Sequence, residues 1–222
     1  MESANITQFR EGSVRGFLHR PDEPGSAGLV LTHGAGSNCR APLIVAVAEA
    51  FCSAGLLVLR CDLPFRQNRP FGPPFPKTAA EDRAGLKDAI TALRDLGCTK
   101  AFLGGHSYGG RQASILASED PEVTDALLLM SYPLHPPKKP DQLRTDHFPR
   151  LQTPSLFLHG TKDPFGSIEE ITAALRLISA PTKVVSIDGA GHDLARGKFD
   201  LEQLVAEFRN LSASASAPRE RS

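Results

Sequence analysis

The chain has 222 residues, 41% of them hydrophobic and 23% charged, a composition that excludes an intrinsically disordered protein. Because 25 lysines and arginines balance 25 aspartates and glutamates, the charge does not favour nucleic acid or an anionic membrane as a partner. We expect a single domain over residues 1–211, and a disordered tail over the low-complexity residues 212–222.

The beginning of the chain is polar. Its first twelve residues lack the apolar run of a secretory signal, and the apolar stretch at residues 41–48 is too short to span a membrane. The four cysteines, at positions 39, 52, 61 and 98, have neither a disulfide-framework nor a metal-ligand spacing. We therefore expect a cytoplasmic protein with reduced thiols and no metal or cofactor.

Short apolar runs recur along the chain and predict strands. They cover residues 13–18, 28–32, 56–60, 100–103, 126–131, 155–158 and 183–187. Several of them, such as residues 127–130, are apolar at successive positions. That pattern is typical of strands buried on both faces of a parallel sheet.

Amphipathic stretches alternate with these runs and predict helices. They cover residues 43–54, 86–96, 112–119, 168–178 and 201–208, with Pro42, Gly97 and Ser167 suited to helix ends. The proline-rich segments 63–77 and 132–154 are predicted as loops. This order predicts an α/β fold: a mostly parallel, twisted sheet with helices on both faces and no separate lid domain.

The sequence Gly-His-Ser-Tyr-Gly at residues 105–109 stands between a predicted strand and a predicted helix. In that context, a Gly-x-Ser-x-Gly motif forms a strained turn that exposes the serine hydroxyl, and its glycines avoid collisions with the neighbouring strand and helix. The alternative is a glycine-rich turn with an incidental serine. We favour Ser107 as a nucleophile.

A serine nucleophile needs a base and a group that holds the base. Asp163 and His192 each follow a predicted strand, so both belong to loops at the carboxyl ends of the sheet. His192 is favoured because it alone among the seven histidines follows the last predicted strand. Asp188 and Asp193 compete with Asp163 as the carboxylate, and each candidate has the alternative role of an ordinary loop residue.

Acyl transfer also requires donors for the developing oxyanion. We expect them to be the backbone N–H groups of Tyr108 and Ala35, with Gly36 as the alternate for Ala35. Gly34 and Gly36 are expected to let the loop 32–38 approach the substrate, because they are small. This loop lacks the Gly-Lys-Ser/Thr ending of a phosphate-binding loop.

Aromatic side chains are the candidates for the pocket wall. We assign Phe65 and Tyr132 to substrate binding; Phe65, Phe71 and Phe75 either line the pocket or cover the edge of the sheet. Several basic residues are expected near its mouth, where solvent-exposed loop charges are favoured over a site for an anionic substrate. These residues are Arg66, Arg69, Arg111, Lys138 and Lys139.

From residue 13 to residue 211, the chain resembles the α/β-hydrolase superfamily, and within it the small, lidless group similar to dienelactone hydrolases. The resemblance rests on the segments HGAGS (33–37), GHSYG (105–109), HGTKDP (159–164) and GAGHD (189–193). Residues 104–111 and 131–137 resemble a branch of predicted hydrolases that includes the hydrolase-like domain of a subunit of the NSL histone-acetyltransferase complex.

The resemblance implies an eight-stranded sheet and a Ser–His–Asp triad. Dienelactone hydrolases have a cysteine nucleophile, and Ser107 in its place argues against dienelactone as the substrate. We expect a serine hydrolase, monomeric or homodimeric, that cleaves small esters, thioesters or lactones through an acyl-enzyme on Ser107. The alternatives are a non-catalytic protein-interaction module on the same scaffold and a peptidase. The complete set of triad residue types favours catalysis.

Overall fold

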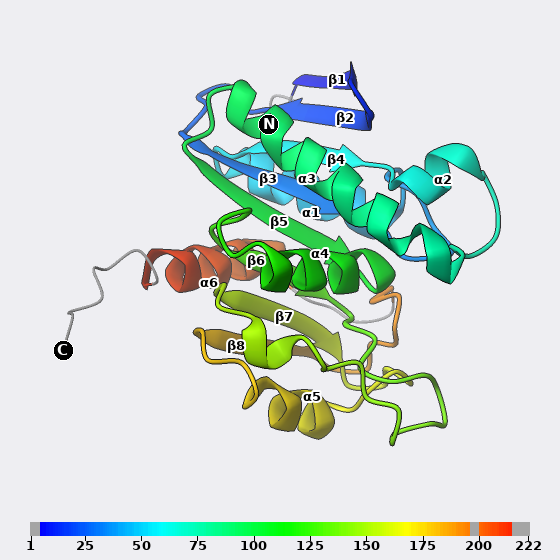
Figure 1. The fold of residues 1–222 in the computed structure, drawn as a ribbon. Helices are drawn as coiled ribbons and strands as arrows, with labels where there is room; N and C mark the ends of the chain where they lie inside the picture. The colour runs from blue at the N-terminus through cyan, green and yellow to red at the C-terminus, as the bar shows by residue number, and fades with distance from the viewer. Residues whose placement is uncertain (1–4, 196–199, 215–222) are drawn as a thin grey trace.

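The computed structural model describes residues 5–195 and 200–214. Eight strands form one sheet in the order β1-β2-β4-β3-β5-β6-β7-β8 (Figure 1). Strands β1 and β2 form an antiparallel hairpin, β2 pairs antiparallel with β4, and the remaining pairs are parallel. The strands are β1 (Asn5–Glu11), β2 (Val14–Arg20), β3 (Ala27–Thr32), β4 (Leu57–Cys61), β5 (Lys100–His106), β6 (Leu127–Met130), β7 (Ser155–Gly160) and β8 (Thr182–Ile187).

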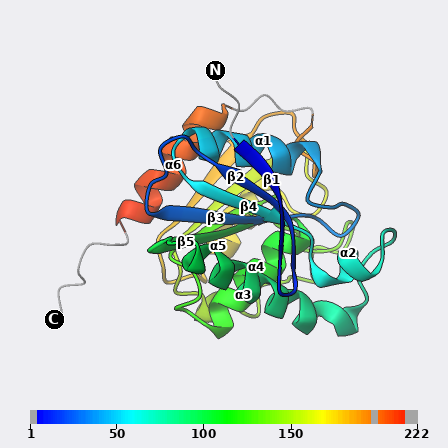
Figure 2. The same ribbon diagram turned by 90° about the horizontal axis from the view of Figure 1, so that it is seen from above.

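Helices cover both faces of the sheet, as predicted (Figures 1 and 2). Helices α1 (Pro42–Ser53) and α6 (Leu201–Ser214) pack on one face, and α3 (Ala79–Asp95), α4 (Tyr108–Glu119) and α5 (Ile168–Leu175) on the other. Short helical segments follow β4 and β6: α2 (Pro64–Asn68) and the 3-10 turns Pro76–Thr78 and Phe148–Arg150.

The continuous apolar strands have two buried faces because successive side chains alternate across a strand. Val30, Leu103 and Leu129 belong to the core under α3, α4 and α5. Their neighbours Leu31, Leu128 and Met130 belong to the core under α1 and α6. The two cores therefore hold the sheet in a layer between the helices, with its carboxyl ends free to carry loops.

The predicted elements are confirmed in the main, with local corrections. Strand β1 is missing from the prediction because only Phe9 of its seven residues is buried, so no apolar alternation marks it. The segment 63–77, predicted as a loop, contains α2 and a 3-10 turn. Helix α5 ends at Leu175, and α6 continues to Ser214, into the segment that was expected to be disordered.

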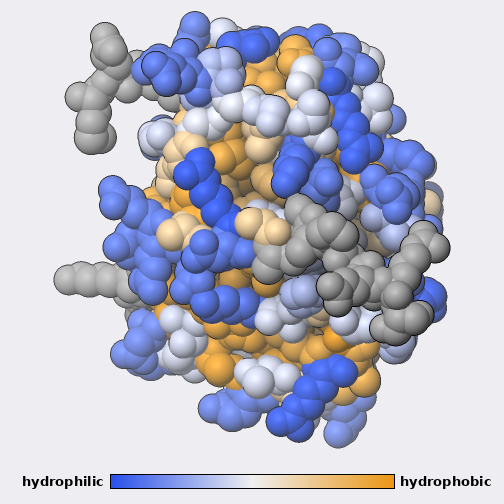
Figure 3. Space-filling view, turned by 90° about the vertical axis from the view of Figure 1, so that its left-hand side faces the viewer, coloured by the Kyte–Doolittle hydropathy of each residue, from blue (hydrophilic) through white to orange (hydrophobic). Residues whose placement is uncertain are grey.

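The face on the left-hand side of Figure 1 lies at the amino ends of the parallel strands. Figure 3 shows that hydrophilic side chains there surround limited areas of apolar surface. Among the described residues, no helix combines the length and apolarity needed to cross a membrane.

Candidate active site

Ser107 lies at the sharp turn between β5 and α4. Its backbone has φ 50° and ψ −115°, a conformation that costs a residue other than glycine about 1–3 kcal/mol. The neighbouring glycines permit the turn. A Cβ on Gly109 would lie 2.6 Å from the carbonyl oxygen of His33, and one on Gly105 would lie 2.7 Å from the nitrogen of Gly110. The glycines thus let α4 start directly against β5 and the loop after β3.

Three residues from three loops meet at this turn. The Ser107 hydroxyl lies 2.8 Å from Nε2 of His192, and Nδ1 of His192 lies 2.8 Å and 3.0 Å from the two carboxylate oxygens of Asp163. Because a carboxylate only accepts hydrogen bonds, Nδ1 carries the proton, which leaves Nε2 to accept from the serine hydroxyl. This arrangement can transfer a proton from Ser107 to His192.

The loops after β7 and β8 are joined by backbone hydrogen bonds. The nitrogen of Lys162 donates to the oxygen of Ala190 at 2.9 Å, and that of Thr161 donates to the oxygen of Ile187 at 3.0 Å. A Cβ on Gly160 would lie 2.3 Å from the oxygen of Ala190. Glycine at this position therefore allows the close approach that brings Asp163 to His192.

The imidazole of His192 is held on several sides. The ring of Phe165 stacks on it with 4.1 Å between centroids and 30° between planes. The backbone nitrogen of Phe165 donates to Asp163, whose side chain is fully buried. Nε2 of His106 donates to the carbonyl oxygen of His192 at 2.7 Å, and burial lowers the pKa of His106, which keeps its ring neutral. Both the ring and the backbone of His192 are therefore positioned.

The competing candidates have other hydrogen-bond partners, although one of them, His159, lies 3.7 Å from the Asp163 carboxylate. Asp188 accepts a hydrogen bond from the Thr161 hydroxyl, and Asp193 accepts one from the backbone nitrogen of Ala195. His159 is fully buried, and its Nε2 lies 2.8 Å from the oxygen of Gly166. These residues support loops, whereas Asp163 contacts the imidazole of His192.

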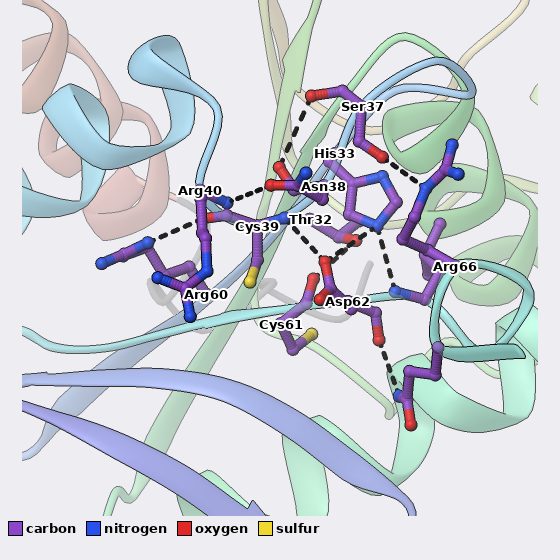
Figure 4. A network of polar contacts seen from close by, with 12 residues as sticks. Thr32, His33, Ser37, Asn38, Cys39, Arg40, Arg60, Cys61, Asp62 and Arg66 are labelled. Carbon is purple, nitrogen blue, oxygen red and sulfur yellow. Dashed lines mark hydrogen bonds and ion pairs between the residues drawn. The ribbon is translucent and has the colours of Figure 1, made fainter. Parts of the chain in front are cut away.

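The loop after β3 is supported by a buried histidine (Figure 4). His33 is fully buried; its Nδ1 donates to the oxygen of Gly34 at 2.9 Å, and its Nε2 accepts from the nitrogen of Leu63 at 3.2 Å. Burial lowers the pKa of His33, which favours the neutral ring that both bonds require. His33 thus connects the loops that follow β3 and β4.

Arg66, expected near the pocket mouth, instead holds this same loop from α2 (Figure 4). Only 6% of the residue is exposed. Its guanidinium donates to the carbonyl oxygens of Ser37 at 2.7 Å and Ala35 at 2.8 Å, and also to those of Arg69 and Gly72. Its donors are therefore used within the protein, and its role is to fix the carbonyl groups of the loop.

A cavity of about 470 Å³ opens at Ser107. Among the described residues, no acceptor binds the backbone N–H of Ala35 or of Tyr108, and both residues line this cavity. The two amides are thus available to a ligand beside the serine. The wall consists of Ala35, Pro73, Pro74, Phe75, Pro76, Ala79, Ser107, Tyr108, Arg111, Gln112, Pro133, Arg144 and Phe165.

The structure corrects the predicted wall. Phe65 is 4% exposed and packs against the rings of His33 and Tyr108, so it belongs to the core behind the site. Tyr132 is fully buried, and its hydroxyl donates to the oxygen of Arg144 at 2.6 Å. Both residues are too deeply packed to contact a substrate in the cavity.

The remaining candidates for the pocket wall lie in different places. Phe75 lines the Ser107 cavity, whereas Phe71 is 82% exposed. Gly34 lines a second cavity of about 680 Å³ beside α1. Gly36 is exposed on its loop, and a Cβ at this position would have no atom within 4 Å.

Asp82 on α3 is a site residue that the sequence does not indicate. Its carboxylate is fully buried, and it accepts from the Tyr108 hydroxyl at 2.7 Å and from the nitrogen of Phe65 at 2.9 Å. Burial raises the pKa of Asp82. Local sequence marks it only as an acidic residue in the first turn of a helix, so its partners could not be inferred.

Comparison with known proteins gives the same architecture. A family model described as an alpha/beta hydrolase domain matches residues 25–217. A hydrolase of Pseudomonas sp named 2-hydroxy-6-oxononadienedioate/2-hydroxy-6-oxononatrienedioate hydrolase is 29% identical over 131 residues, or 58% of this chain. The chain covers only 44% of that relative's length.

Solved structures of similar fold cover nearly the whole chain. Est1E from Butyrivibrio proteoclasticus aligns with 97% of this chain and 100% of its own at 17% identity and a TM-score of 0.70. A dienelactone hydrolase from Anabaena variabilis aligns with 96% of this chain and 97% of its own at 24% identity and a TM-score of 0.69.

A lidless α/β serine hydrolase from Xanthomonas campestris also has this fold. It aligns with 96% of this chain and 94% of its own at 15% identity and a TM-score of 0.71. These identities establish similarity of fold, while the family model covers most of the sequence. The chain belongs to the alpha/beta hydrolase domain family.

Proposed function

We propose that the protein is a serine hydrolase that cleaves carboxylic esters, thioesters or lactones through an acyl-enzyme on Ser107. The observation that carries this proposal is the continuous hydrogen-bond chain Ser107–His192–Asp163 at the wall of a cavity. The free amides of Ala35 and Tyr108 beside the serine support it, because acyl transfer needs donors for a developing oxyanion.

In the proposed reaction, His192 takes the proton of Ser107 as the serine oxygen attacks the substrate carbonyl. The amides of Ala35 and Tyr108 stabilise the negative oxygen, and Asp163 stabilises the imidazolium. The tetrahedral intermediate then expels the alcohol or thiol, which takes the proton from His192. Water, deprotonated by His192, then attacks the acyl-enzyme and forms a second tetrahedral intermediate. When this intermediate collapses, the acid is released and His192 returns the proton to the Ser107 oxygen.

The test combines active-site labelling with hydrolysis. Wild-type protein should react with a fluorophosphonate probe and hydrolyse a panel of p-nitrophenyl esters, thioesters and lactones. Ser107→Ala should abolish labelling and lower kcat/KM at least about 10³-fold, because the nucleophile acts together with its base. Ser186→Ala removes an exposed hydroxyl on β8 and serves as the matched control.

Labelling or hydrolysis that persists in Ser107→Ala would refute Ser107 as the nucleophile. A wild-type protein that neither reacts with the probe nor hydrolyses any member of the panel would favour the non-catalytic interaction module. Circular dichroism of each variant distinguishes a lost hydroxyl from a lost fold.

A further inference from the structure

Two arginines, Arg111 and Arg144, line the cavity at Ser107. The cavity wall contains no aspartate or glutamate among the described residues. The rest of the wall is largely apolar, with the rings of Phe75 and Phe165 and several prolines. The cavity therefore combines apolar surface with positive charge.

Arg111 stands in the first turn of α4, and its backbone nitrogen donates to the oxygen of Ser107 at 2.9 Å. Side chains of a helix lean toward its N-terminus, so a side chain four residues beyond Ser107 lies over the turn that carries the serine. The Nε atom of Arg111 is buried and has no hydrogen-bond partner. A buried guanidinium donor without an acceptor is costly, so the protein compensates the cation of Arg111 only in part.

Arg144 reaches the same cavity from the loop between β6 and β7. Its backbone is fixed, since its nitrogen donates to the oxygen of Leu134 at 2.8 Å and its oxygen accepts from the Tyr132 hydroxyl at 2.6 Å. One guanidinium nitrogen donates weakly to the oxygen of Pro133 at 3.3 Å. Burial and the nearby Arg111 cation lower the pKa of Arg144, in accord with two like charges close together.

Two other arginines beside the site, Arg66 and Arg83, have their donors engaged within the protein. Arg66 donates to four carbonyl groups, and Arg83 pairs with Glu119 at 3.0 Å. By contrast, no carboxylate of the described residues lies within 4.0 Å of the guanidinium of Arg111 or Arg144. Two adjacent cations without a counterion favour the binding of an anion.

We propose that the substrate of the Ser107 site carries a carboxylate, which Arg111 and Arg144 bind while the scissile carbonyl lies at Ser107. The planar guanidinium groups match a carboxylate, and the apolar wall accommodates the carbon chain that joins it to the ester. This inference rests on the proposed hydrolase function and narrows its substrate class to anionic esters, thioesters or lactones.

The test compares two esters that differ in charge alone. One is the mono-p-nitrophenyl ester of adipic acid, and the other is its analogue with a terminal carboxamide in place of the carboxylate. Wild-type protein should have a kcat/KM at least tenfold higher for the carboxylate, since each charge-assisted hydrogen bond contributes about ten- to a hundredfold. The ratio should decrease as salt is added, because ions screen a partly exposed charge pair.

The variants Arg111→Gln and Arg144→Gln should each lower that ratio about tenfold or more. Arg176→Gln, which removes an exposed arginine beyond the end of α5, should keep the wild-type ratio. Arg111→Lys should be intermediate, because lysine keeps the charge and loses the planar pair of donors. A ratio near one in wild type, or an unchanged ratio in both glutamine variants, would overturn the inference.

A binding measurement separates this inference from the proposed function. Calorimetric titration of the Ser107→Ala variant with both esters needs no turnover, and the carboxylate should bind at least tenfold more tightly. Equal affinities would refute the carboxylate site even if Ser107 hydrolyses both esters. Tighter carboxylate binding to a protein without hydrolytic activity would refute the proposed reaction and leave the anion site in place.

Discussion

The backbone of Ser107 occupies a conformation that depends on its neighbours having no side chain. Gly109 is one of them, because a Cβ there would lie 2.6 Å from both the His33 oxygen and the Thr32 methyl carbon. The His33 oxygen belongs to the loop after β3, which the hydrogen bonds of the buried His33 ring hold in place. The same glycine therefore determines the packing of α4 and the position of the serine.

We predict that Gly109→Ala destabilises the protein by about 1–3 kcal/mol, because an added methyl group overpacks the contact between α4 and β3. Urea unfolding measures the change. Gly36→Ala is the control, since no atom lies within 4 Å of the position of its Cβ, and its effect should stay within about 0.5 kcal/mol. Equal stability of the two variants would contradict the packing argument.

At the scale of elements, α3 connects α2 with the start of α4. Asp82 makes the connection: it accepts from Phe65 at the start of α2 and from Tyr108 at the start of α4. Because the proposed oxyanion donor is the backbone of Tyr108, the position of α3 bears on the site without contributing a side chain to its chemistry.

We predict that Asp82→Ala lowers the free energy of unfolding by about 2–4 kcal/mol, since two buried donors lose their acceptor. Asp82→Asn should cost less, because its amide can accept from Phe65 and donate to the Tyr108 hydroxyl oxygen. Glu81→Gln, an exposed neighbour, should change stability by no more than about 0.5 kcal/mol. Chemical denaturation ranks the three variants, and an asparagine variant as unstable as the alanine variant would be inconsistent with this account.

At the scale of the whole molecule, buried histidines make stability depend on pH. Burial lowers the pKa of His19 and of His147 to about 4, with the Arg60 cation adding to the effect at His19 and Arg111 at His147. Their ordinary pKa is near 6.5. Between these values the unfolded chain binds more protons than the folded one, so the free energy of unfolding rises with pH in that window.

We predict that lowering the pH from 7 to 5 destabilises the fold by about 1–2 kcal/mol for each of these two histidines. Urea titrations at the two pH values measure the loss. His147→Gln retains a donor toward the Ser114 hydroxyl, which lies 2.8 Å from Nε2, and does not titrate. This variant should lose about 1–2 kcal/mol less unfolding free energy between pH 7 and pH 5 than the wild type. An unchanged loss would exclude His147 as a source of the pH dependence.

The architecture could be predicted from the sequence, because the patterns that indicate it are local. Continuous apolar runs such as residues 127–130 indicated strands buried on both faces, and the glycines around Ser107 indicated a strained turn between strand and helix. The order of strands also indicated that the loops bearing Asp163 and His192 belong to the carboxyl edge of one sheet. Strand β1 was not predicted, because a polar edge strand has no such apolar pattern.

Tertiary structure alone decided which side chains face the cavity and which face the core. A phenylalanine on a proline-rich segment looks the same in sequence whether it packs on Tyr108, as Phe65 does, or lines the cavity, as Phe75 does. Arg66 and Arg111 are likewise the same residue type in the sequence. In the fold, carbonyl groups of a distant loop accept from Arg66, whereas the Nε atom of Arg111 has no acceptor. The reason is physical: burial and hydrogen-bond satisfaction depend on atoms far apart in the chain, which are brought into contact only by folding.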